Sequence, residues 1–278
     1  MNANMSMKKT PVYIFAAICA VVFIYPLIFT LLSAFKDNNE IYMNSIFSLP
    51  VEWRWSNFSL AFVDAKIGMS ILNSFIYAIA GTLLTLLLAT MASYVLARHP
   101  FKGSSFVYIY FIIGLMIPIF SLMIPISRLI GSFNGFNNYL VMIVLYGTFE
   151  LPLAIFLITG FMKGINKEID ESAVMDGCGP ARLLFQILTP LAMPAISTAG
   201  ILAFFSIYND LIWNVILVTD KEMFNISMAL MAFIGERGAS QMGPTFAGIM
   251  ITIIPTVIVY LLFQERVESG LAAGAVKE

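Results

Sequence analysis

Residues 163–182 read KGINKEIDESAVMDGCGPAR, a polar stretch in the middle of a very apolar chain. Of the 278 residues, 60% are hydrophobic and 11% are charged, and the mean hydropathy is +0.90. A soluble domain carries about 25% charged residues, so this composition is typical of a polytopic membrane protein. We therefore expect the polar stretch to lie at a bilayer surface as a platform for a partner.

Charge and residue types exclude several other classes of protein. The formal net charge is -1 and no dense Lys/Arg cluster occurs, which argues against a nucleic-acid partner. Cys19 lies in an apolar run and Cys178 in the polar stretch, so neither a disulfide nor a metal site is expected. The single histidine, His99, is interpreted as an interfacial residue rather than a catalyst.

Six apolar runs are expected to cross the membrane, which predicts an all-α fold. A bilayer core of about 30 Å needs about 20 helical residues, and the first run is too long for the apolar part of a signal peptide. Pro26 is expected to kink its helix, and Pro118 and Pro125 are expected to bend or break theirs. The six runs are residues 10–35, 71–97, 106–126, 139–162, 191–218 and 246–263. The fifth is interrupted by polar residues at 208–210 and at Asn214, and the last is of marginal length.

The distribution of cations predicts the orientation of the six spans. Lys and Arg are more numerous on the side of both termini and of the polar stretch, which the positive-inside rule places in the cytoplasm. Residues 36–70 and 220–243 are then external loops. Trp53 and Trp55 in the first of these fit either the lipid headgroup level or the surface of a soluble partner. The cytoplasmic set is Lys8, Lys9, Arg98, Lys102, Lys163, Lys167, Arg182, Arg266 and Lys277.

The polar stretch itself is predicted to form two short helices joined by a tight turn. Residues 167–176 carry carboxylates early, where they complement a helix N-terminus. Gly177 is expected to end this helix in a left-handed conformation, and Pro180 to open the next one. Ile165, Ile169 and Ala173 form an apolar stripe that packs either into a partner's groove or against the protein's own underside.

The spacing in this stretch resembles the EAA loop of permease subunits in binding-protein-dependent ABC importers. That pattern is Glu-Ala-Ala, three residues, Gly, nine residues, then Ile, any residue, Leu and Pro. Here it reads Glu171-Ser-Ala, Gly177, Ile187 and Pro190, with Ser172 and Thr189 departing from it. Residues 208–217, YNDLIWNVIL, look like a core-helix segment of carbohydrate importers, and residues 33–36 fit that group. The ending 270–277, GLAAGAVK, resembles the tail of the maltose permease G type.

This resemblance implies a type I importer fold with six transmembrane helices in the bacterial inner membrane. The implied divisions are residues 1–70, with the N-terminal segment, first helix and external loop; 71–263, a five-helix core that includes the EAA loop 163–192; and a cytoplasmic tail, 264–278. The implied partners are a second homologous permease, a cytoplasmic ABC ATPase dimer, an extracytoplasmic solute-binding protein and a sugar. Because the chain lacks a Walker A pattern, no cofactor is expected here and ATP-Mg is expected on the ATPase.

Carried over residue by residue, the resemblance also implies two contact regions for the ATPase. Glu171 is expected to pair with a basic residue in an ATPase cleft, with Gly177 as the turn. The coupling set is Glu171, Ser172, Ala173, Asp176, Gly177 and Pro190. The tail residues expected at the ATPase dimer interface are Gly270, Leu271, Gly274 and Lys277.

Polar residues inside the predicted spans are candidates for pore lining or solute contact. Carboxylates such as Glu150 and Asp210 are costly within a membrane and call for a cavity or a partner. Hydrogen-bonding amides and an aromatic ring face would suit a sugar. These candidates are Asn73, Asn209, Asn214 and Trp213. The alternative is that all six bond to neighbouring helices or to the second permease.

Three rival functions are weighed against a sugar importer. A secondary transporter should show repeated halves with matching broken helices, and no such repeat is seen. A membrane-embedded enzyme needs a converging set of catalytic groups, for which one histidine leaves little. An ABC permease for a solute other than a sugar stays open.

Overall fold

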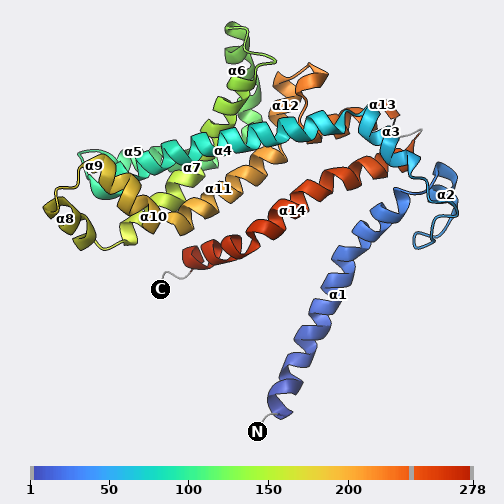
Figure 1. The fold of residues 1–278 in the computed structure, drawn as a ribbon, viewed down its shortest axis with the longest axis horizontal. Coiled ribbons are helices and arrows are strands. Elements are labelled where there is room, and N and C mark those ends of the chain that lie inside the picture. Colours follow the sequence, from blue (N-terminus) through green and yellow to red (C-terminus); the bar gives the residue numbers. More distant parts are fainter. Residues whose placement is uncertain (1–2, 238–240, 276–278) are drawn as a thin grey trace. The chain divides into compact units, whose positions relative to one another are not determined.

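The computed structural model describes residues 3–237 and 241–275, and the side chains of 12–236 and 241–264. Every regular element within these ranges is helical, as predicted (Figure 1). The chain divides into two compact units, each treated by itself below. Unit 1 comprises residues 1–68 and 229–255, and unit 2 comprises residues 69–228 and 256–278. Three helices run across this division: α4 (Ile67–Arg98), α13 (Ile226–Arg237) and α14 (Met242–Ala275).

Unit 1 contains one long helix followed by a folded loop. α1 (Ala3–Ser33) is followed by α2 (Asn38–Met43) and α3 (Ser56–Asp64). The loop packs closely on the start of α14. At Gly243 the backbone lies so near the carbonyl oxygen of Lys36 that a Cβ atom there would overlap it. Phe29 of α1 also makes an edge-to-face ring contact with Phe246 of α14, at 5.3 Å. The predicted external loop 36–70 is therefore largely structured.

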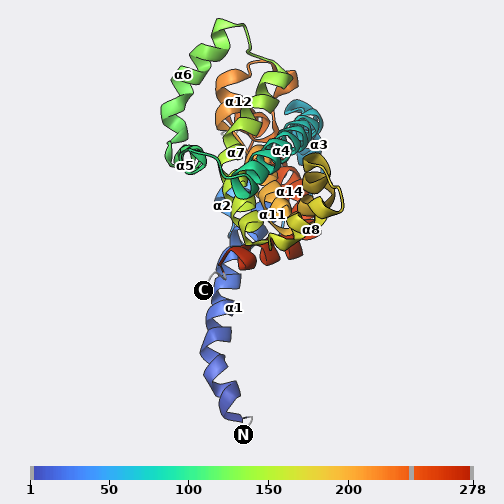
Figure 2. The same ribbon diagram turned by 90° about the vertical axis from the view of Figure 1, so that its left-hand side faces the viewer.

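Unit 2 holds the remaining helices. The longest helix that lies wholly in unit 2 is α7 (Tyr139–Gly164). It packs against α11 (Met193–Tyr208) and is joined to α4 by hydrogen bonds (Figures 1 and 2). The other elements are α5 (Ser104–Ile113), η1 (Gly114–Met116), α6 (Ile119–Ser132), α8 (Glu168–Met175), α9 (Pro180–Arg182), the π-helical turn η2 (Leu183–Leu188), α10 (Thr189–Leu191), α12 (Ile212–Leu217) and η3 (Lys221–Met223).

Close packing in unit 2 depends on small residues between α4 and α7. A Cβ atom at Gly147 would lie 2.9 Å from Leu84 Cδ2, so the side chain of Leu84 packs directly against the backbone of α7 at this glycine. The hydroxyl of Thr85 also donates to the carbonyl oxygen of Gly147 at 3.1 Å. Small residues with interhelical hydrogen bonds are typical of helix packing in membranes.

Four helices of the described chain are long and apolar enough to cross a membrane: Val12–Ser33, Ile67–Arg98, Tyr139–Gly164 and Met242–Gln264. Two further helix pairs pass the same test but are sharply bent. Ser104–Met116 and Ile119–Ser132 meet at 101°, and Pro180–Leu191 and Met193–Tyr208 meet at 78°. The count reaches the predicted six when each bent pair is taken as one span.

The prolines explain where the third run breaks. Ile117 has an extended backbone (ψ 119°) directly before Pro118, as the ring of a proline demands of the preceding residue. The helix therefore ends at Met116 and restarts at Ile119. Pro125 lies inside α6, so the helix does not break there, and α1 continues through Pro26.

The fifth run loses its helix after Tyr208 and resumes at Ile212, which confirms the interruption predicted at residues 208–210, whereas the helix continues through Asn214. Two predicted boundaries were wrong. α6 continues to Ser132 and takes in the start of the predicted loop 127–138. α14 is 34 residues long, so it begins inside the predicted loop 220–243 and continues through most of the predicted polar tail. Polar residues mark a membrane boundary, but most of them are compatible with a continuing helix.

Candidate functional site

The platform, defined as residues 163–192, begins with the predicted short helix. α8 spans Glu168–Met175, with three carboxylates in its first turn. Gly177 follows at φ +80°, which confirms the predicted left-handed turn. Its N–H donates to Val174 O and the N–H of Cys178 donates to Ala173 O, both at 2.9 Å. This pair of bonds is a Schellman motif, which satisfies the last carbonyls of α8 and fixes the turn.

The second half of the platform is also as predicted. Gly179 is extended (φ -75°, ψ 164°), and Pro180 is the first residue of α9. The helix then continues through η2 and α10 to Leu191, with Pro190 in its last turn. In Figure 1, α8 and α9 lie beyond the ends of α4 and α7.

The apolar stripe of α8 divides between two environments. Ala173 is buried in an apolar cluster with Met162 and Leu188, and Ile165 packs against the same cluster. Ile169 is exposed. Ile165 and Ala173 therefore pack against the protein's own helices and not into a partner's groove.

The outward face of α8 is open and mixed in character. Met175 is 87% exposed, and Val174 is also exposed. Glu171, Ser172 and Asp176 lie exposed beside them. We call these five residues the outer face of α8. It combines two carboxylates with two large, exposed apolar side chains.

A buried ion pair fastens α8 to the end of α4. The Arg98 Nε atom lies 2.8 Å from Asp170 Oδ2, and the two side chains are only 2% and 17% exposed. Arg98 Nη2 also donates to the carbonyl oxygen of Ile165 at 3.0 Å. The approach of Nε to Oδ2 lacks hydrogen-bond alignment, and Arg98 Nη1 and Asp170 Oδ1 have no hydrogen-bond partner among the described residues. Charge attraction therefore dominates the pair.

Sequence reasoning missed this pair. The predicted second run ended at residue 97, whereas Arg98 is the last residue of α4. The two residues are far apart in the chain, and no local pattern relates them. Only the packing of α8 against the end of α4 brings them together.

A second polar site lies among the spans of unit 2. Glu150 of α7 and Asp210, which follows α11, line the same pocket of about 220 Å³ together with Tyr146, Ser206 and Trp213. The hydroxyl of Tyr146 donates to Asp210 Oδ2 at 2.9 Å. The structure thus brings together the two intramembrane carboxylates that the sequence singled out.

Asp210 also shapes the backbone at the break after α11. Its carboxylate accepts from the N–H groups of Trp213, at 3.4 Å, and Asn214, at 3.3 Å. The side-chain amide of Asn225 donates to the Asp210 carbonyl oxygen. These bonds supply partners for backbone groups that the broken helix would otherwise leave unpaired within a membrane.

The remaining solute-contact candidates bond mainly within the protein. Asn73 donates to Glu222 O at 2.7 Å and Phe224 O at 3.0 Å, and it accepts from the hydroxyl of Tyr139 at 2.8 Å. Asn209 is exposed, and its amide donates to Phe205 O at 2.9 Å.

Trp213 and Asn214 are both fully buried. The ring of Trp213 packs on Phe149 at 4.8 Å, and Asn214 Oδ1 accepts from the N–H of Asn225 at 3.2 Å. Asn214 Nδ2 is buried without a hydrogen-bond partner among the described residues.

The tail residues fall largely outside what the structure describes. Gly270, Leu271 and Gly274 lie in the last turns of α14, where the backbone but not the side chains is described. Lys277 lies outside the described residues.

A family model described as "Binding-protein-dependent transport system inner membrane component" matches residues 81–272. The chain belongs to this family. The matched range takes in the platform, the carboxylate pocket and most of α14. The protein is therefore a permease subunit of an ABC importer, an inner membrane transport component rather than an enzyme.

Named relatives match this permease over most of their length. The diacetylchitobiose uptake system permease protein NgcG of Streptomyces coelicolor is 32% identical over 92% of this chain and 84% of the relative. The probable ABC transporter permease protein YurM of Bacillus subtilis is 32% identical over 97% of this chain and 89% of the relative. The melibiose/raffinose/stachyose import permease protein MelC of Bacillus subtilis is 28% identical over both full chains.

A solved structure confirms the fold of the permease. The crystal structure of a bacterial ABC transporter involved in the import of the acidic polysaccharide alginate contains a chain with a TM-score of 0.82 to this one. The match covers 95% of this chain and 98% of that chain at 21% identity. The likeness shows the predicted ABC importer fold.

Proposed function

We propose that this permease forms half of the translocation pore of a sugar importer and receives the ATPase stroke through the platform. The observation that carries this proposal is α8, a short acidic helix whose outer face is open while its inner face is fixed to the core by Ala173 and Asp170. Because it is held in this way, α8 is expected to move as a rigid body and to pass its displacement on to the helices it packs against. The platform and both termini then face the cytoplasm.

The coupling step follows from how α8 is held. Closure of two ATP-bound ATPase subunits displaces whatever is seated in their clefts, and rigid-body movement of packed elements is a common route for such changes. A displacement of α8 reaches α4 through Arg98 and Asp170, and reaches α7 through the cluster around Ala173 and Met162. Glu171 supplies the charge that pairs with a basic group in the cleft. ATP-Mg stays on the ATPase, and the end of α14 extends toward its dimer interface.

The proposed solute is a sugar. A solute-binding protein outside the membrane binds it and delivers it to a pore that this permease forms with a second permease. The names of NgcG and MelC support this class of solute. In this chain, Glu150 and Asp210 are the proposed contacts, since carboxylates accept hydrogen bonds from hydroxyl groups. The internal bonds of Asn73 and the burial of Trp213 and Asn214 favour structural roles for them. A solute other than a sugar would leave the coupling proposal unchanged.

Replacing Glu171 tests the proposed docking. The Glu171→Ala variant should lose most ATPase copurification and ATP-driven uptake while inserting normally into the membrane. Glu168→Ala is the matched control, because Glu168 is exposed in the same helical turn and bonds to Asn166 at 3.0 Å. The proposal fails if Glu171→Ala copurifies as much ATPase as Glu168→Ala and supports the same uptake.

A further inference from the structure

We propose that residues 42–51 of unit 1 form an interfacial anchor, whose apolar side chains enter the lipid boundary at the outer leaflet. The occupant of this surface is the bilayer itself. The inference rests on α1 as a membrane span and on the loop that follows it, and it does not depend on docking of the ATPase at the platform.

The composition of this segment differs from that of a water-facing loop. Residues 42–51 read YMNSIFSLPV and contain no charged residue. Met43 is 83% exposed and Val51 is 78% exposed. Exposed apolar patches of this kind mark sites of contact with proteins or membranes. The other exposed large side chains of the segment are Tyr42, Ile46, Phe47 and Leu49.

A ring contact fixes the depth of the segment against α1. Phe47 packs edge-to-face on Tyr25, with ring centroids 5.5 Å apart. Tyr25 lies eight residues before Ser33, where α1 ends, so it is about 12 Å back along the helix at about 1.5 Å per residue. The chain therefore folds back beside the span.

The same counting places this contact in the outer part of the hydrocarbon core. A core of about 30 Å takes about 20 helical residues. Counted from the cation Lys9, it ends near Phe29, four residues or about 6 Å beyond Tyr25. Tyr25 and Phe47 then lie just inside the membrane boundary, the region where amphipathic aromatic rings are favoured.

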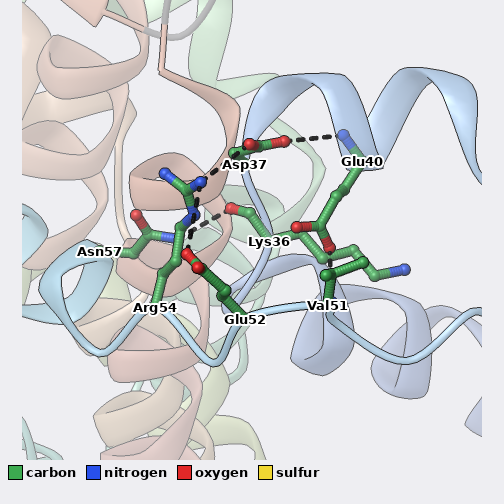
Figure 3. Close-up of polar contacts among 7 residues, drawn as sticks. All are labelled: Lys36, Asp37, Glu40, Val51, Glu52, Arg54 and Asn57. Atoms are coloured by element: carbon green, nitrogen blue, oxygen red, sulfur yellow. Dashed lines mark hydrogen bonds and ion pairs between the residues drawn. The ribbon is translucent and has the colours of Figure 1, made fainter.

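A network of polar contacts closes the base of this loop (Figure 3). Asp37 accepts from the N–H of Glu40 at 2.8 Å and pairs with Arg54 at 3.0 Å. Glu40 in turn accepts from the N–H of Val51 at 3.1 Å, so the two ends of the apolar segment are tied together. The side-chain amide of Asn57 donates to the carbonyl oxygens of Ala34 and Lys36, each at 2.9 Å, in the turn that follows α1. The charged residues thus lie outside the segment 42–51. Besides Glu40, the buried Lys36 reaches this segment, because its Nζ donates to Ser48 Oγ at 3.1 Å.

This arrangement favours lipid over a soluble partner. Interfaces between soluble proteins are about as polar as ordinary protein surface, and their rims carry charge. Trp53 and Trp55 were predicted to contact either lipid headgroups or a soluble partner. Both rings also pack on Phe35, with ring centroids 5.0 and 4.8 Å apart, so only part of each ring is available for such a contact. The uncharged segment 42–51 is therefore the surface suited to the headgroup and acyl boundary.

Fluorescence quenching from the lipid phase tests the anchor in the assembled transporter. Cys19 and Cys178 are first replaced by serine, and an environment-sensitive dye is attached at Met43→Cys or, as a control, at Glu52→Cys. Met43 suits labelling because it is the more exposed position, whereas replacing Phe47 would remove its ring contact. The control sits at the charged base, where Glu52 is exposed beside Arg54.

In nanodiscs that contain lipids with a nitroxide near the headgroup end of the acyl chain, the Met43→Cys probe should show blue-shifted emission and a marked loss of intensity. The Glu52→Cys probe should be quenched by aqueous iodide instead. Equal lipid quenching at both positions would overturn the anchor. So would protection of the Met43→Cys probe that appears only when the solute-binding protein is added.

Discussion

Arg98 and Asp170 show most directly how a single pair of residues links the platform to the spans. Both side chains are withdrawn from solvent, at 2% and 17% exposure, and they join the last residue of α4 to the first turn of α8. Removing one partner of a buried pair leaves an uncompensated charge, which costs about 3–5 kcal/mol in well-buried cases. The pair is therefore a sensitive point for coupling.

The Asp170→Asn variant should transport less solute for each ATP hydrolysed, because α8 loses its charged link to α4 while its outer face is untouched. Uptake and ATP hydrolysis are measured together in proteoliposomes. ATPase copurification should persist, and the exchanged pair Arg98→Asp with Asp170→Arg should recover part of the coupling. A normal transport ratio in Asp170→Asn would show that the pair has no part in transmission.

The carboxylate pocket carries the second prediction at this scale. Glu150→Gln keeps the shape of the side chain and one acceptor oxygen but removes the charge. Hydrogen bonds to charged groups contribute about 1.5–3 kcal/mol, and those to neutral groups about 0.5–1.5 kcal/mol. The loss of about 1 kcal/mol should raise the KM for uptake about fivefold, because 1.4 kcal/mol is a factor of about ten. ATPase copurification should be unaffected. An unchanged KM would assign Glu150 to helix packing.

At the scale of the element, α8 and its turn were predictable because their signals are local. Early carboxylates, Gly177 and Pro180 each act within one or two turns of helix, and the structure places all three as expected. Pro118 likewise marks its break locally. The length of α14 was not predictable from hydropathy, since a helix continues past the apolar run that defines its span.

The Gly177→Val variant should disrupt the platform, because a β-branched residue at φ +80° is strained by at least about 1–2 kcal/mol. Uptake should fall while the spans still insert. Gly179→Ala is the matched control: Gly179 has φ -75° and open space around its Cβ position, so this variant should behave as wild type. Equal activity of the two variants would mean that the turn geometry is not needed.

At the scale of the whole molecule, the sequence predicted the class of fold and the position of its polar platform, but not the contacts between distant segments. The pairing of Arg98 with Asp170 and the bonds of Asn73 to residues 222 and 224 arise only when helices far apart in sequence pack together. Asn73 was predicted to lie within a span as a candidate for solute contact. Its side chain instead forms three hydrogen bonds within the protein, which favours a structural role.

The central claim is that the outer face of α8 is where the ATPase docks. A photo-crosslinking amino acid placed at Met175, which is 87% exposed on that face, tests this directly. Met116, 79% exposed at the bend before α6, is the control position. In the assembled transporter, the Met175 probe should form an adduct with the ATPase subunit and the Met116 probe should not. An assembled complex in which the Met175 probe forms no ATPase adduct would contradict the account.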